Sequence, residues 1–230
     1  LYNNPAAPKS SDNPSNNKVY ISNGKVPELL RKFFNSKGGD FQIDYTSNAY
    51  FKDNFGQLLN PKMPFRFQMV KNIFSFDNIV SSPIISRYEY YGGEYFFKNA
   101  LNRRFAGFGK IIHKDDSNNS IETYFHQGNG DNNLTSEQND QESNIGKPYR
   151  IDRTDASYNL YNRIWQYWDN TELGNGRNFS RLATKTAVVY DTNESSKASM
   201  EQYAYDTGNG NLIEKLLLGE IKTTPEGKFK

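Results

Sequence analysis

The stretch RFAGFGKIIHKDDSNNSIETYFH, residues 104–126, contains the pattern that decides the fold. Aromatic and aliphatic residues dominate positions 104–113 and 121–126, and the segment 115–119 between them consists of Asp, Ser and Asn. Aromatic and β-branched side chains suit the pleated surface of a sheet, whereas Asp, Asn and Ser favour turns. The stretch therefore predicts two strands joined by a tight turn.

The same pattern continues in both directions along the chain. Before this stretch, strands are expected at 65–76 and 84–91, with breaks at Asp77-Asn78 and at Gly92-Gly93. After it, strands are expected at 149–153, 160–168, 180–190, 200–205 and 211–221. Short strands separated by turn signals are typical of an antiparallel meander. The predicted fold is therefore all-β, built from antiparallel strands and hairpins, with few or no helices.

Residues 26–45 allow two interpretations. The apolar residues within 26–34 would share one face of a helix that starts near Pro27. However, Gly38-Gly39 follows directly, and residues 41–45 alternate strictly between apolar and polar. Two apolar runs on either side of a Gly-Gly turn are typical of a hairpin, so we favour a hairpin here.

Two segments lack the strand pattern. Residues 1–18 are rich in Pro, Asn and Ser, which predicts a flexible linker or strap ahead of a β-sheet segment spanning 19–230. The sheet would begin at 19–21 and turn at Asn23-Gly24. Residues 128–146 are polar and rich in Asn, Gln and Gly, which predicts a long exposed loop.

The composition excludes several classes of function. The 230 residues carry 28 Lys plus Arg and 26 Asp plus Glu, and this net charge of +2 argues against nucleic acid as the main partner. The absence of cysteine removes disulfides, thiolate metal sites and cysteine nucleophiles. No apolar run approaches the roughly 20 residues of a membrane-spanning helix. Hydrophobic residues make up only 35% and aromatic residues 15%, which favours a sheet with wide polar surfaces over a thick core.

The sequence offers little for catalysis. His113 ends an expected strand beside Asp115-Asp116, and His126 precedes the long loop. A His–carboxylate pair can act as a general base, but neither histidine lies in a nucleophile elbow or a metal-ligand spacing. The acidic runs 115–122 and 131–133 lack the Gly and Glu positions of an EF-hand and predict turns. We therefore expect no catalytic, cofactor or metal site, and a hydrolase built on His126 is kept as a third hypothesis.

The aromatic residues suggest a second hypothesis, a carbohydrate- or cell-surface-binding β module. Trp165 and Tyr167 would share one side of a strand and Trp168 the other. Together with the loop 128–146, these rings could form a sugar-binding surface. In an all-β protein the same residues also serve as cross-strand packing, and the sequence leaves both roles open.

The most informative local motif is YAYDTGNGNLI, residues 203–213. Tyr203 and Tyr205 would point to one face of a strand, and Asp206 would cap the turn that follows. Gly208 and the Asn and Gly residues after it tolerate left-handed dihedral angles, and Leu212 would begin the return strand. The motif resembles the YD repeat of the Rhs family.

A second motif combines SRYEYYGGEY, residues 86–95, with RRFAGFGKI, residues 103–111. This pair is similar to a hairpin of SpvB-like proteins and of the B components of bacterial toxin complexes. Flanking pieces follow the family order over about residues 26–221. The residues that carry this resemblance are Tyr88, Tyr90, Arg104, Phe105, Gly107, Phe108 and Gly109. Gly107 and Gly109 are expected to permit a bulge or the close approach of a neighbouring strand.

The resemblance implies a structural function without a catalytic site. In such bacterial virulence proteins, a secreted hollow shell of β-strands encloses a toxic effector, which a pore-forming component then receives. The chain has one clear YD repeat and no visible effector domain, so it is expected to be a section of the shell wall. Its terminal strands would then pair with strands outside residues 1–230, because unpaired strand edges promote association.

Overall fold

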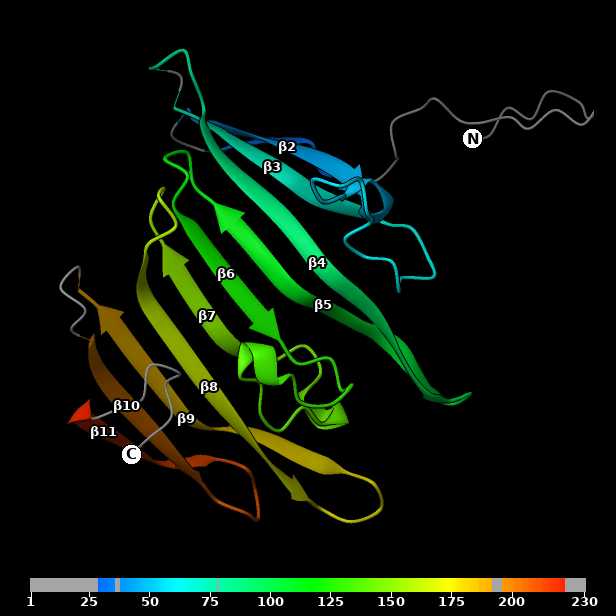
Figure 1. Cartoon of the computed structure of the whole chain (residues 1–230), viewed down its shortest axis with the longest axis vertical. Coiled ribbons are helices and arrows are strands. Elements are labelled where there is room, and N and C mark those ends of the chain that lie inside the picture. The colour runs from blue at the N-terminus through cyan, green and yellow to red at the C-terminus, as the bar shows by residue number, and fades with distance from the viewer. Residues whose placement is uncertain (1–28, 36–37, 78, 192–195, 222–230) are drawn as a thin grey trace, which may run out of the picture. The chain divides into compact units, whose positions relative to one another are not determined.

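The structure is a computed structural model that describes residues 29–35, 38–77, 79–191 and 196–221. Its strands form one sheet of eleven, ordered from β1 to β11 as they follow in the chain, and each is antiparallel to its neighbours (Figure 1). The all-β prediction is confirmed. The strands are β1 (Lys32–Phe34), β2 (Asp40–Ser47), β3 (Gln68–Phe76), β4 (Ile84–Asn99), β5 (Asn102–Lys114), β6 (Ser120–Phe125), β7 (Pro148–Thr154), β8 (Leu160–Glu172), β9 (Asn178–Tyr190), β10 (Ser196–Tyr205) and β11 (Leu212–Ile221).

The hairpin expected around Gly38-Gly39 is present. β1 and β2 pair in antiparallel fashion, with Phe33 opposite Phe41. The two rings stack with their centroids 4.7 Å apart, which adds an aromatic cross-strand contact to the pairing. The predicted linker 1–18, the strand 19–21 and the turn at Asn23-Gly24 lie outside the described residues.

The predicted break at Gly92-Gly93 is wrong, because β4 runs through both glycines. Gly92 has a φ of +63°, which glycine adopts more easily than residues with a Cβ atom. The Gly93 N–H donates to Asn60 Oδ1 at 2.8 Å, and a Cβ atom at Gly93 would overlap the Met63 side chain. The glycine pair therefore allows a distant loop to dock against the middle of β4.

That loop covers one face of the sheet. Residues 48–67, which include the short 3-10 helix η2 (Asn48–Tyr50), bring Phe51 onto a buried cluster with Met69 and Phe108. Phe67 and Tyr90 pack against the same cluster. β3 was expected to start at residue 65 but begins only at Gln68, because the backbone groups of Phe65 and Phe67 form hydrogen bonds with Asn48 instead.

A second loop, residues 126–147, packs on the other face. Tyr90 and Tyr91 are successive residues of β4 and so point to opposite faces. Tyr90 joins the apolar cluster, whereas Tyr91 lies 4.7 Å below the Lys110 ammonium group, which also covers Tyr124 at 5.6 Å. The Tyr124 ring in turn neighbours Tyr149, whose hydroxyl donates a hydrogen bond to the second loop. Each face of the thin sheet therefore has its own covering loop.

Candidate functional site

The loop between β6 and β7 was expected to be long and exposed. Its residues 129–134 are exposed, whereas Glu137, Asp140 and Asn144 are buried within a folded structure. Its base is closed by two backbone hydrogen bonds, from His126 N to Lys147 O at 3.0 Å and from Gly146 N to His126 O at 2.9 Å. It contains two short 3-10 helices, η3 (Asn133–Thr135) and η4 (Glu142–Asn144). Several of its polar side chains turn inward and hydrogen-bond with one another or with the loop backbone, so a hydrophilic sequence forms a folded structure.

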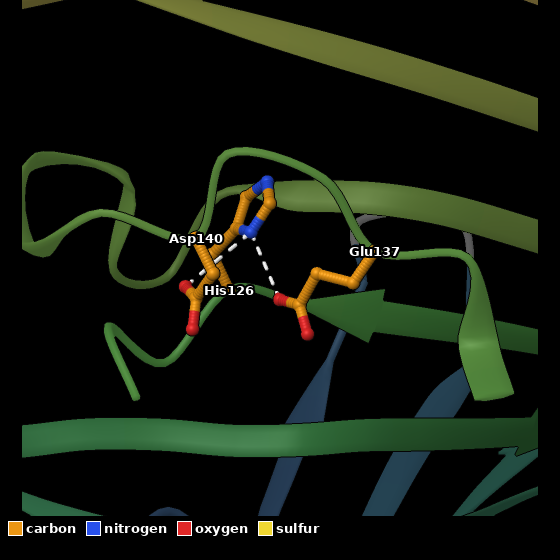
Figure 2. Close-up of side chains that lie close together, drawn as sticks. All are labelled: His126, Glu137 and Asp140. Carbon is orange, nitrogen blue, oxygen red and sulfur yellow. Dashed lines mark hydrogen bonds and ion pairs between the residues drawn. The ribbon is translucent and has the colours of Figure 1, made fainter. Parts of the chain in front are cut away.

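The centre of this loop is a cluster of three buried side chains, His126, Glu137 and Asp140 (Figure 2). His126 has no exposed surface. Its Nδ1 lies 2.9 Å from Glu137 Oε1 and 3.4 Å from Asp140 Oδ1, so both carboxylates converge on one ring nitrogen. The opposite nitrogen, Nε2, is buried and has no partner within the described part of the chain.

The backbone of the loop holds Asp140 in place. Asp140 Oδ1 accepts the N–H of Gly128 at 2.7 Å, and Oδ2 accepts the N–H groups of Asn129 and Gly130 at 2.8 and 3.0 Å. Three converging amide dipoles stabilise a carboxylate in its charged form. Asp140 therefore links the backbone of residues 128–130 to the imidazole of His126.

Burial and charge act in opposite directions on the three groups. Burial lowers the pKa of His126, but the hydrogen bonds to Asp140 and Glu137 outweigh it and leave the pKa above its ordinary value. Burial raises the pKa of Glu137. Burial also disfavours the Asp140 carboxylate, yet His126 and the backbone amides lower the pKa of Asp140 below its ordinary value. Relative to the free side chains, the cluster thus favours the charged forms of His126 and Asp140.

Sequence reasoning named His126 but missed its two partners. Glu137 and Asp140 follow it by 11 and 14 residues with no periodic spacing, and only the folded loop brings them together. Within the described residues, the polar contacts of the imidazole are with these two carboxylates, and no serine or threonine hydroxyl reaches it. The cluster can therefore hold a proton or a cation.

A hollow opens beside the cluster on the same face of the sheet. It has a volume of about 210 Å³ and is lined by Glu137 together with the rings of Tyr91, Tyr124 and Tyr149. Its lining also includes amide side chains, among them that of Asn132. Glu137 is thus the member of the cluster that lies between the buried histidine and the hollow.

A row of alternating aromatic and cationic side chains crosses this face. Neighbouring strands pair Tyr91 with Lys110, Lys110 with Tyr124, Tyr124 with Arg150 and Arg150 with Trp165. The Arg150 guanidinium lies 4.6 Å from the Tyr124 ring and 5.3 Å from Trp165. Each such contact stabilises the sheet by about 0.5–1 kcal/mol at partly exposed positions.

This row bears on the proposed sugar-binding residues. Trp165 is half-buried and covered by guanidinium groups, and Trp168 lies under the Lys147 ammonium group at 4.8 Å and donates to Pro148 O at 2.7 Å. Only Tyr167 of the three is exposed. The arrangement favours cross-strand packing over a stacking platform for sugars.

The residues of the hairpin motif form aromatic contacts in the sheet. Tyr90 lies 5.0 Å from Phe108, and Phe105 lies 5.5 Å from Phe108. Tyr88 stacks on His113 at 4.8 Å, so His113 lies within β5 as a packed side chain. Arg104 donates to Glu142 O at 2.7 Å and thereby ties β5 to the second loop.

The two glycines of this motif differ in their roles. Gly107 has a φ of +86° beside a register shift between β4 and β5, which confirms the expected bulge. A Cβ atom at Gly109 would lie 2.8 Å from Gln127 Oε1. The close approach predicted there therefore involves a side chain of the second loop.

The YD motif forms the turn between β10 and β11. Asp206 Oδ1 accepts the Gly208 N–H at 2.7 Å, and Leu212 begins β11, as the sequence predicted. Tyr203 donates to Glu201, and Tyr205 packs edge-on against Phe179 with ring centroids 6.3 Å apart. Both tyrosines therefore have structural contacts.

Comparison with known families decides the relationship. Residues 14–131 match the family described as insecticide toxin TcdB, middle/N-terminal region. The chain belongs to this family. The match begins before β1 and ends in the second loop, so it includes the whole hairpin motif and His126. Membership makes the chain a toxin-related component. It is consistent with the chain being part of a larger toxin complex.

No curated protein matches the chain. Across the described residues, no helix has the length and apolar character needed to cross a membrane.

Proposed function

We propose that the chain is a section of the wall of a β-shell that contains and delivers a toxic effector, and that it has no catalytic activity of its own. The observation that carries the proposal is the sheet, in which eleven strands follow one another in chain order (Figure 1). Such a meander can be extended at either edge by further strands. The family match supplies the toxin context.

The finer assignment to the Rhs and SpvB-like type of shell rests on the two motifs. Their residues form a tight turn at Asp206 and aromatic contacts around Phe108, and both of these are structural roles. The proposed partners are the remainder of the shell, its effector cargo and a pore-forming component that receives the cargo. A secreted location follows from this role and is part of the proposal.

A high-resolution structure of the product of the longest reading frame that contains this sequence tests the proposal. We expect β1 and β11 to pair with further strands, and the extended sheet to enclose a cavity that holds polypeptide. A sheet with both edges in solvent, or one that surrounds no cavity, would contradict the shell role.

A further inference from the structure

The cluster of His126, Glu137 and Asp140 has a geometry that suits more than a proton. A proton on Nδ1 is shared unequally, since Glu137 Oε1 lies at 2.9 Å and Asp140 Oδ1 at 3.4 Å. Zinc bonds of about 2.0–2.2 Å to nitrogen and carboxylate oxygen place neighbouring ligand atoms of a tetrahedral site roughly 3.3 Å apart. The observed distances from His126 Nδ1 to the two carboxylate oxygens, 2.9 and 3.4 Å, lie on either side of that spacing.

We propose that His126, Glu137 and Asp140 bind one divalent transition-metal ion, with Zn²⁺ as the best-fitting species. The ion would take the place of the proton on Nδ1 and contact one oxygen of each carboxylate. These three ligand atoms lie within 4.8 Å of one another. Small side-chain adjustments would therefore bring all three within bonding distance of one ion. The proposal is independent of the shell role.

The charges of the cluster favour a divalent ion. Two carboxylates and a neutral ring carry a charge of −2, and protonation of the ring still leaves −1. In the described part of the chain, neither Glu137 nor Asp140 forms an ion pair with a lysine or arginine. Buried charge is costly, and the backbone amides offset it only at Asp140. A divalent ion would balance the neutral ring and both carboxylates.

The loop arranges the ligands before any ion binds. Backbone amides hold Asp140 from one side, and Figure 2 shows one of its carboxylate oxygens joined to the imidazole by a dashed line. Glu137 lines the hollow of about 210 Å³, which gives an ion a route from solvent and gives water room as a fourth ligand. Imidazole as a ligand selects transition metals over Mg²⁺ and Ca²⁺.

Titration of the untagged, EDTA-treated chain with ZnCl₂ in a calorimeter tests the proposal. We expect one Zn²⁺ per chain and no binding of MgCl₂ or CaCl₂. Glu137→Gln keeps the shape of the side chain but removes a charged ligand, and it should weaken Zn²⁺ binding by about 10–100-fold or more. The matched control is Glu142→Gln in the same loop, which pairs with Lys98 and should leave Zn²⁺ affinity unchanged.

A second measurement remains decisive if the Glu137 variant does not fold. The chain has two histidines, so only two sets of imidazole resonances, those of His113 and His126, have to be assigned in the NMR spectrum. Zn²⁺ should shift the His126 ring and leave His113 unchanged. Absence of Zn²⁺ binding, equal affinity in the Glu137→Gln variant, or a shift at His113 would each overturn the site.

Discussion

Gly107 shows how one backbone angle fixes a bulge in the sheet. Its φ of +86° is rarely adopted by L side chains, while a Cβ atom there would meet nothing within 4 Å. The cost of substitution is therefore conformational. We expect Gly107→Val to lower the free energy of unfolding by about 1–3 kcal/mol, measured by urea denaturation.

Gly219 in β11 provides the control for this prediction. It also has open space around its Cβ position but does not have a left-handed φ. Gly219 also lies at a register shift, here between β10 and β11, so it offers a bulge without the left-handed angle. Gly219→Val should change stability by less than about 0.5 kcal/mol. Equal effects at the two positions would mean that the bulge at Gly107 carries no strain.

Asp152 is the most heavily paired acid of the sheet. It is buried and accepts hydrogen bonds from Arg163 at 2.6 and 2.8 Å and from Arg150 at 2.5–3.1 Å. Burial alone would raise the pKa of Asp152, but the two guanidinium groups outweigh it and hold the pKa below its ordinary value. Its charged form therefore stabilises the folded state.

The sign of this shift gives a pH prediction. A carboxyl whose pKa is lower in the folded state contributes stability that is complete above its unfolded pKa and is lost as the pH falls through the folded pKa. Asp152→Asn should lower the free energy of unfolding by about 3 kcal/mol at pH 7 and flatten its decline below about pH 5. Asp169→Asn, in a more exposed pair with Arg181, should cost less than about 1 kcal/mol.

Two hairpins of the sheet share one five-residue turn. In 115–119 the Asn119 N–H donates to Asp115 Oδ1 at 2.8 Å, and in 155–159 the Asn159 N–H donates to Asp155 Oδ1 at 2.9 Å. The fourth residue of each turn has a φ of +64°. The turns β5–β6 and β7–β8 thus have the same geometry despite different sequences.

The fourth position of these turns yields a stabilising substitution. It is Asn118 in one turn and Tyr158 in the other, and Asn adopts left-handed angles more readily than Tyr. Tyr158 is exposed, so its replacement removes little packing. We expect Tyr158→Asn to raise stability by about 0.5–1 kcal/mol and the melting temperature by roughly 1–4 °C.

A tyrosine inside a strand serves as the control. Tyr161→Asn in β8 should lower the melting temperature, because Asn is unfavourable in strands. If Tyr158→Asn also lowered the melting temperature, relief of backbone strain in the turn would be the wrong explanation.

The elements also show which features the sequence could predict. The turn at 115–119 was predictable because its Asp and Asn act on neighbouring backbone groups. Gly92-Gly93 was not, since its role depends on Asn60, more than thirty residues away. His126 could be named from the sequence, but its burial required a polar loop to fold on itself. Long-range docking of irregular segments leaves no periodic signal.

At the scale of the whole sheet, the two edges differ. β1 is three residues long, whereas β11 has ten residues and several exposed apolar side chains. Among the described residues, no strand pairs with the outer side of β11. A long apolar edge of this kind is a template for another strand, so we expect the isolated sheet to associate through β11.

A substitution at Leu217, which is 67% exposed, tests whether the chain associates through β11. In a symmetric antiparallel pair of two β11 strands, residues near the middle of the strand lie close to the two-fold axis. Leu217→Lys would bring two positive charges together there and should weaken self-association at least about tenfold, or about 1.4 kcal/mol, as measured by sedimentation equilibrium. Leu101→Lys makes the same change at an exposed turn between β4 and β5 and should leave association unchanged. A wild-type chain that stays monomeric, or equal weakening by both variants, would show that β11 is not an interaction edge.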